Sequence, residues 1–206
     1  TGLINVEKGP YGYCEILNFK DGKDGSIFYN SSFMPCNNGT ISSRCTITKG
    51  VRAPSNSVLD MKGNSLTFVR DARLNSDGEL CDSGGCENAT NFTIIANVLN
   101  LSEGNITSDG GGAIGNALGH RSGEGGVITI NASQIFIGTN AEISASSDYV
   151  FNSGNAHQGG NAGTISLNAT LVNNTGIIRA AGGTGDTATC TLGDRGERGN
   201  GGKIIL

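Results

Sequence analysis

Three segments of the chain, GSIFYNSSFM (25–34), GVITINASQI (126–135) and GTISLNATLV (163–172), superimpose without a gap. Each begins with Gly, alternates apolar and polar residues, and reaches an Asn at its sixth position. This two-residue alternation predicts a β-strand with one buried face. The inward pairs are Ile27/Tyr29, Ile128/Ile130 and Ile165/Leu167. The phrase is therefore a repeated structural unit.

The same inward pair recurs through the rest of the chain at spacings of 32 to 39 residues. We place its other copies at Leu59/Met61, Phe92/Ile94 and Ile204/Leu206. A second alternating pair follows, clearest at Leu66/Phe68, Leu99/Leu101 and Ile135/Ile137. A third short strand is expected around Ile41, Leu74, Ile106, Ile143 and Ile178. The sequence thus predicts three short strands per repeat.

Three short strands cannot bury their apolar faces alone, but coils stacked on one another form a continuous interior. Gly-, Ser- and Asp-rich stretches such as 108–112 and 181–185 absorb the differences in repeat length. We therefore predict an all-β fold, a parallel β-solenoid (β-helix) of about six coils over residues 25–206. Residues 1–24 are expected to supply strands that complete a coil, of this chain or of a neighbouring subunit. A β-sandwich is the structural alternative, but it does not require the phrase to return at this spacing.

The composition excludes several classes of protein. The chain has 206 residues with 34 Gly, 3 Pro, no Trp and 16% charged residues, so helices should be scarce. The net charge is −4 and the basic residues are scattered, which argues against a nucleic-acid partner. No apolar run approaches the roughly 20 residues of a membrane-spanning helix. The start at Thr1, without a charged and apolar leader, fits a mature secreted protein.

Nine N-x-Ser/Thr sequons also favour a secreted protein that carries covalent N-glycans. They are at Asn30, Asn38, Asn88, Asn91, Asn100, Asn105, Asn131, Asn168 and Asn173. The alternative is that these Asn, Ser and Thr residues serve only in turns. Because Asn30, Asn131 and Asn168 share a register, we expect their glycans to lie on one face of the solenoid.

The six cysteines indicate disulfides outside the reducing cytosol. The short separations predict bridges from Cys36 to Cys45 and from Cys81 to Cys86, each closing a loop outside the coil core. Cys14 and Cys190 remain, and they can pair within one chain or between subunits. Buried free thiols are the alternative, but these cysteines stand among polar and Gly residues.

Several acidic residues and both histidines are candidates for catalytic or metal-binding groups. Asp77, Asp109 and Asp148 recur at the ends of third strands, and Glu103 falls near the register of Glu142. Such a row suits catalysis or Ca²⁺, but a turn role is favoured because no acid partner faces it. Four other features are expected to be loops: His120, His157, and the segments 21–25 and 193–199. We predict no catalytic residue, no metal site and no cofactor.

Three further phrases resemble glycine-rich parallel β-helical surface proteins, which include extracellular adhesins, cell-wall proteins and filaments. They are GTISL (163–167), GIIRAAGG (176–183) and GGKIIL (201–206), and the resemblance is clearest over residues 126–206. It implies a β-helical shaft rather than any single activity. The first 125 residues differ in their cysteines and longer polar insertions.

These observations lead us to expect a structural extracellular glycoprotein, the head-to-tail subunit of a surface filament. Strand 203–206 begins a coil, and the alternating residues of 1–6 and 13–16 could complete it from the next subunit. A monomeric adhesin or cell-wall domain is the alternative. A β-helical carbohydrate-active enzyme is the third choice.

Overall fold

The computed structural model describes residues 38–39, 44–79, 86–112, 121–147, 158–183 and 198–206. These residues form twelve strands and no helix. The strands are β1 Asn38–Gly39, β2 Arg44–Ile47, β3 Gly50–Arg52, β4 Ser57–Asp60, β5 Ser65–Phe68, β6 Arg73–Asn75, β7 Phe92–Thr107, β8 Val127–Ser144, β9 Thr164–Asn168, β10 Leu171–Asn174, β11 Ile177–Arg179 and β12 Lys203–Ile205.

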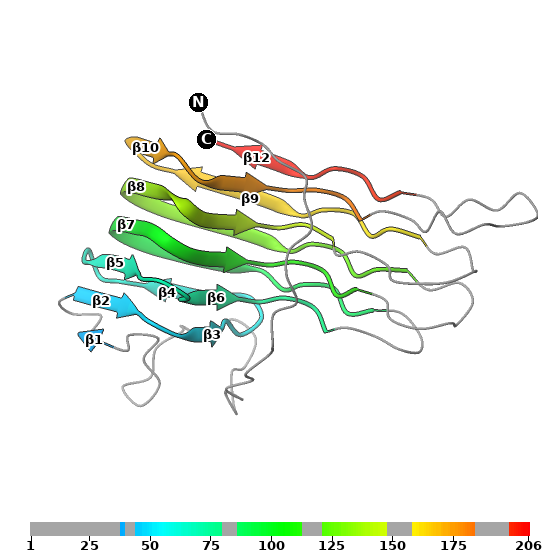
Figure 1. Cartoon of the computed structure of the whole chain (residues 1–206), viewed down its shortest axis with the longest axis horizontal. Helices are drawn as coiled ribbons and strands as arrows, with labels where there is room; N and C mark the ends of the chain where they lie inside the picture. The colour runs from blue at the N-terminus through cyan, green and yellow to red at the C-terminus, as the bar shows by residue number, and fades with distance from the viewer. Residues whose placement is uncertain (1–37, 40–43, 80–85, 113–120, 148–157, 184–197) are drawn as a thin grey trace, which may run out of the picture.

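The strands stack as the coils of a parallel β-solenoid, which confirms the predicted fold class (Figure 1). The first face of the solenoid consists of β4, the start of β7, the start of β8, β9 and β12. The second face runs from β2 through β5 and the middles of β7 and β8 to β10. The third face runs from β3 through β6 and the ends of β7 and β8 to β11. All these pairings are parallel, and the short β1 adds to β2 in the antiparallel sense.

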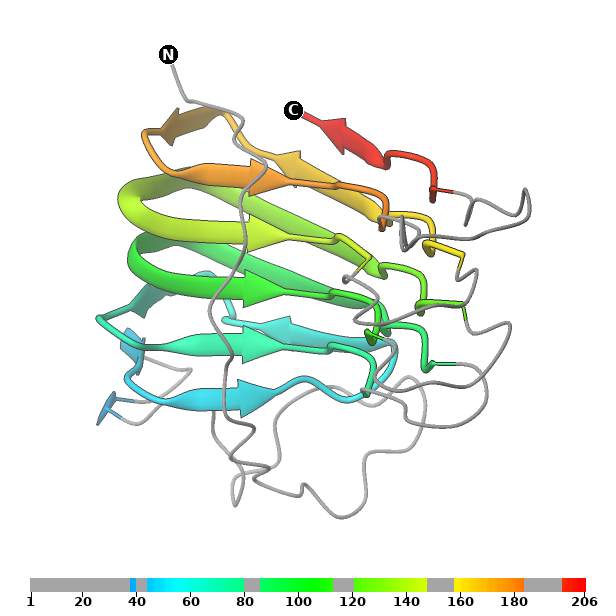
Figure 2. The ribbon, with the colours of Figure 1, turned by 45° about the vertical axis from the view of Figure 1, so that its right-hand side comes forward.

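The coils lie one above another (Figure 2). Equivalent inward residues of successive coils therefore stack and form an apolar interior. Ile128 pairs with Ile165, and Ile130 pairs with Leu167, as the superimposed phrases predict. The second-strand and third-strand residues, from Leu66 and Leu74 onward, stack in the same way. Alternating outward residues are partly exposed, so each strand is buried on one face only.

Two sequence assignments were wrong. Leu59 pairs with Ile94 instead of Phe92, so the first inward pair of its coil is Ser57/Leu59 rather than Leu59/Met61. A slip of two residues keeps every side chain on the same face, and alternation alone cannot detect it. The third-strand residue below Leu74 is Val51, not Ile41, which lies outside the described residues.

The side of the solenoid between the third strand and the next first strand is closed by backbone contacts. After each third strand, one carbonyl accepts a hydrogen bond from the residue at the start of the next coil. The distances are 3.0 Å for Thr90 N–H to Ser76 O, 2.9 Å for Gly126 to Ser108, 2.8 Å for Gly163 to Ala145 and 3.0 Å for Gly202 to Ala180. A Cβ at Gly163 would collide with the carbonyl oxygen of Gly126. Glycine is therefore required here by close backbone approach.

One corner of the solenoid is shorter than the corners above and below it. Four residues (69–72) join the second and third strands in the β5–β6 coil, and four (138–141) join them in β8, but only three (102–104) do so in β7. Gly104 absorbs the difference with φ +91° and lies against the carbonyl of Ala72. Asn105 N–H also donates to Ala72 O at 2.9 Å. The β7 corner is consequently recessed.

Cys45 and Cys86 are both disulfide-bonded. Cys45 is fully buried at the second-strand position paired with Leu66, so its side chain faces the core. A cysteine side chain is small and weakly polar, which suits this apolar position. Cys14, Cys36, Cys81 and Cys190 lie outside the described residues, and the proposed pairings stay predictions.

Candidate functional site: outer faces and ends of the solenoid

The sequons of the described residues are distributed over all three faces of the solenoid. Asn131 and Asn168 pair on the first face, as their shared register predicts. Asn100 and Asn173 lie in one outward column of the second face, each paired with Phe136. Asn105 lies on the third face, opposite Glu142. Glycans on these residues would surround the solenoid laterally rather than cover one face.

The remaining sequons lie beside the first face or outside the described side chains. Asn88 and Asn91 precede β7, and their side-chain oxygens accept the backbone N–H groups of Glu124 and Val127, both at 2.8 Å. These contacts tie one coil to the next. Asn30 lies outside the described residues, and Asn38 is described only in its backbone.

Asn131 and Asn168 also touch directly, because Asn168 Nδ2 donates to Asn131 Oδ1 at 2.8 Å. Stacked asparagine side chains can bridge successive rungs of a parallel sheet in this way. An N-linked Asn keeps one Nδ2 hydrogen, so this contact remains available after modification. The two side chains thus connect successive coils and also offer attachment points for N-linked glycans.

The β12 end of the solenoid exposes an inward residue whose equivalents are buried elsewhere. Ile204 continues the column Phe92, Ile128 and Ile165, whose members are at most 3% exposed, yet Ile204 is 38% exposed. Within the described residues, β12 has a strand partner on one side only, β9. Among the described residues, β12 therefore combines a strand edge that is paired on one side only with one exposed inward side chain, Ile204.

The carboxylates differ from the predicted row. Asp77 and Asp109 are adjacent, but the residue above Asp109 is Ser146 rather than Asp148, which lies outside the described residues. Glu103 pairs with Asn140 and Glu142 with Asn105, so the two glutamates are not in register. Glu103 lies two positions before Asn105, the residue that pairs with Glu142.

The Asp77–Asp109 pair has a structural arrangement. Asp77 Oδ1 accepts Asp109 N–H at 2.9 Å, and Asp109 Oδ1 accepts Ser146 N–H at 2.6 Å. Ser146 Oγ accepts Ala181 N–H at 3.1 Å, so each side-chain oxygen binds the backbone of the next coil. The predicted turn role is thus modified, because the bonds connect coils instead of closing a local turn. Arg73 also pairs with Asp77 at 2.7 Å.

Burial, followed by repulsion from Asp77, raises the pKa of the Asp109 carboxyl from 3.8 to about 7, although Ser144 and Ser146 donate to it. The folded protein therefore keeps this proton up to about pH 7, whereas the unfolded chain releases it near its ordinary pKa of 3.8. Stability consequently falls as the pH rises between those values and levels off above them.

We expect Asp109→Asn to remove this pH dependence. Asn retains Oδ1 as the acceptor for Ser146 N–H and carries no charge, so at pH 8 the variant should be more stable than wild type by about 1–3 kcal/mol. At pH 4 the difference in the free energy of unfolding between variant and wild type should be small. Urea unfolding at both pH values measures this difference, with exposed Asp71→Asn as the control. The same difference at pH 4 and pH 8 would contradict the raised pKa of Asp109.

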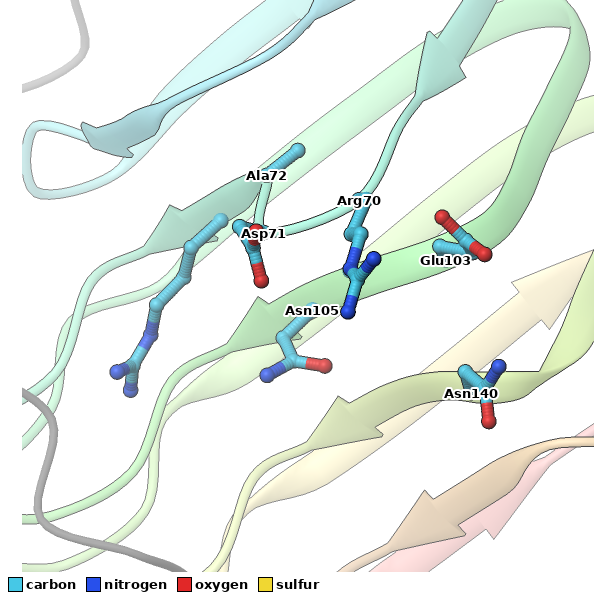
Figure 3. A pocket seen from close by; sticks show the side chains of 8 residues that line it. Arg70, Asp71, Ala72, Glu103, Asn105 and Asn140 are labelled. Carbon is cyan, nitrogen blue, oxygen red and sulfur yellow. The ribbon is translucent and has the colours of Figure 1, made fainter.

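The recessed β7 corner forms an open depression of about 700 Å³ (Figure 3). Glu103 and Asn105 come from β7, Asn140 comes from β8, and Arg70 and Asp71 come from the connection between β5 and β6. Sequence reasoning missed this site. Its signal is the three-residue corner of residues 102–104 between two four-residue corners, which becomes readable only once the strand register is known.

The described ranges contain no group of three or more His, Cys, Asp or Glu side chains that could hold a metal ion. No helix long and apolar enough to cross a membrane occurs among the residues that the structure describes. His120, His157 and the loops 21–25 and 193–199 lie in the undescribed segments, apart from Arg198 and Gly199.

The chain matches no protein-family model, no curated protein and no solved structure. The class of protein that the structure defines is a parallel β-solenoid.

Proposed function

We propose that the protein is a structural, secreted glycoprotein whose subunits stack head to tail in an extracellular filament. The observation that carries this proposal is the contrast between the sides and the β12 end. The three lateral faces carry Asn residues in sequons, and hydrophilic glycans there would oppose side-by-side association. Among the described residues, β12 instead has one strand partner, β9, and leaves Ile204 38% exposed.

Strand addition is the favoured contact because it would pair the free backbone groups of β12 and cover Ile204 together. The candidate donor is segment 1–24 of a second copy, whose alternation at Ile4 and Val6 suits a strand. A contact between unlike surfaces with axial displacement does not close into a ring, so it propagates as a fibre. Glycosylation and disulfides would protect such a fibre outside the cell.

The proposal gives the protein no catalytic role. Both oxygens of Asp77 accept hydrogen bonds, from Asp109 N–H and from Arg73 and Thr107. Asp109 Oδ1 accepts two more, from Ser144 and Ser146. These contacts explain the carboxylate pair as part of the stack and leave Asp77 without an oxygen held ready for a substrate proton.

If subunits join at β12, a substitution there should reduce polymerisation without unfolding the subunit. We expect Ile204→Asp to leave the subunit folded and to reduce assembly at least tenfold, because a carboxylate would be buried in the joint at a cost of at least about 1.4 kcal/mol. Ile95→Asp is the matched control, since Ile95 is also 38% exposed but lies on a lateral face. Sedimentation and electron microscopy measure both. Equal assembly of the two variants would refute β12 as the joint.

A further inference from the structure

The depression at the β7 corner brings a sequon together with a polar concave surface (Figure 3). Asn105 is the first residue after the shortened corner, and Thr107 completes its N-x-Thr motif. The longer corners below and above place Asp71 on one side of Asn105 and Asn140 on the other. The attachment point is therefore recessed between neighbouring coils.

Asn105 differs from the sequons that brace the stack. The side chains of Asn88, Asn91, Asn131 and Asn168 make hydrogen bonds to residues of neighbouring coils. The Asn105 side chain makes none with any residue that the structure describes, although it is half-buried. Its backbone is nevertheless fixed, since Asn105 N–H donates to Ala72 O at 2.9 Å. A group attached to Asn105 thus starts from a rigid point without breaking a side-chain contact.

We propose that this depression is the seat of the first sugars of a glycan attached to Asn105, an inference that rests on the proposed glycoprotein function. In the attachment, Asn105 Nδ2 displaces the diphosphate of a lipid-linked sugar donor. The bond from Nδ2 to the anomeric carbon forms, the bond from that carbon to the diphosphate oxygen breaks, and one Nδ2 proton is released. The other sequons of the described side chains lie outside this depression.

The polar groups around Asn105 suit a saccharide. The Glu103 carboxylate accepts hydrogen bonds from sugar hydroxyls, the Arg70 guanidinium donates to ring and hydroxyl oxygens, and the Asn140 amide can do both. The volume of about 700 Å³ leaves space for more than the Asn105 side chain. A seated sugar would cover Gly104 and the Ala72 carbonyl and would stiffen the corner.

Protection from an amidase that cleaves between Asn and the first sugar tests the inference. The native glycoprotein is digested while folded, in ¹⁸O-labelled water, and each released site is followed by peptide mass mapping. We expect release at Asn105 to be at least tenfold slower than at exposed Asn173, corresponding to about 1.4 kcal/mol of protection. After denaturation the two sites should react alike.

In a Glu103→Ala/Asn140→Ala variant, the ratio of the glycan release rate at Asn173 to that at Asn105 should fall at least threefold. Its unfolding temperature should stay near wild type, because Glu103 is only half-buried and Asn140 is exposed. Gln134→Ala, an exposed change on another corner, is the matched control and should leave the ratio unchanged. Slow release that the double variant does not alter would refute the sugar contacts.

The remaining outcomes separate this inference from the proposed function. A glycan at Asn105 that is released as fast as that at Asn173 would overturn the inference alone. An unmodified Asn105 beside occupied sequons elsewhere would do the same. Unmodified Asn at every sequon would overturn both the inference and the glycoprotein proposal.

Discussion

We expect an Ile94→Asp variant to fail to fold, while Ile95→Asp folds with nearly wild-type stability. Ile94 is fully buried in the first-face column between Leu59 and Ile130. A carboxylate there has no partner and lies within a stack that every coil shares, so the cost should be at least about 4 kcal/mol. Such a loss is a large part of the roughly 5–15 kcal/mol that stabilises a typical domain.

The adjacent Ile95 provides the comparison because it is 38% exposed and points outward from the same strand. Its substitution should change the free energy of unfolding by no more than about 0.5 kcal/mol. Circular dichroism and limited proteolysis of the two variants measure the difference. If both variants fold equally well, the inward and outward assignment of β7 is wrong.

Gly163→Ala should have the second-largest effect. The new Cβ would overlap the backbone carbonyl of Gly126, which cannot rotate away as a flexible side chain could. To remove this overlap, the two backbone segments joined by the hydrogen bond from Gly163 N–H to Ala145 O, 2.8 Å long, would have to move apart. We expect the free energy of unfolding to fall by about 2–3 kcal/mol.

Gly50→Ala is the matched control, since a Cβ at Gly50 meets no atom within 4 Å. It should change stability by no more than about 0.5 kcal/mol. Denaturant unfolding of wild type and both variants gives the comparison. A Gly163→Ala protein as stable as Gly50→Ala would show that the coil closure is looser than the structure has it.

The sequence was sufficient to predict the solenoid because the alternation of apolar residues indicates strands with one buried face, and their repetition indicates that equivalent strands stack. The phrases at 126–135 and 163–172 align in the structure as they do in the sequence, with Ile128 on Ile165. Leu59 was misplaced by two residues because such a slip leaves the alternation unchanged. The third strand was expected around Ile41, but the residue that pairs with Leu74 is Val51.

Site prediction was weaker, because it depends on the lengths of individual corners. The three-residue corner at 102–104 creates the depression beside Asn105, and Glu103 pairs with Asn140 rather than with Glu142. The row Asp77, Asp109 and Asp148 was partly right, but the position above Asp109 belongs to Ser146. Sequence spacing across a variable loop cannot fix register, whereas hydrogen-bonded strands can.

The axial rise of the native filament, measured by cryo-electron microscopy, tests the central claim most directly. The described residues stack five strands on the first face. If the subunit contributes the six coils predicted from the sequence, at about 4.8 Å each, the rise would be about 29 Å per subunit, or less if the coils tilt, together with a 4.8 Å repeat along the axis. The account predicts such a fibre, with β12 at the joint between subunits. Single rods of fixed length, or a fibre whose rise is far from six coil spacings, would contradict it.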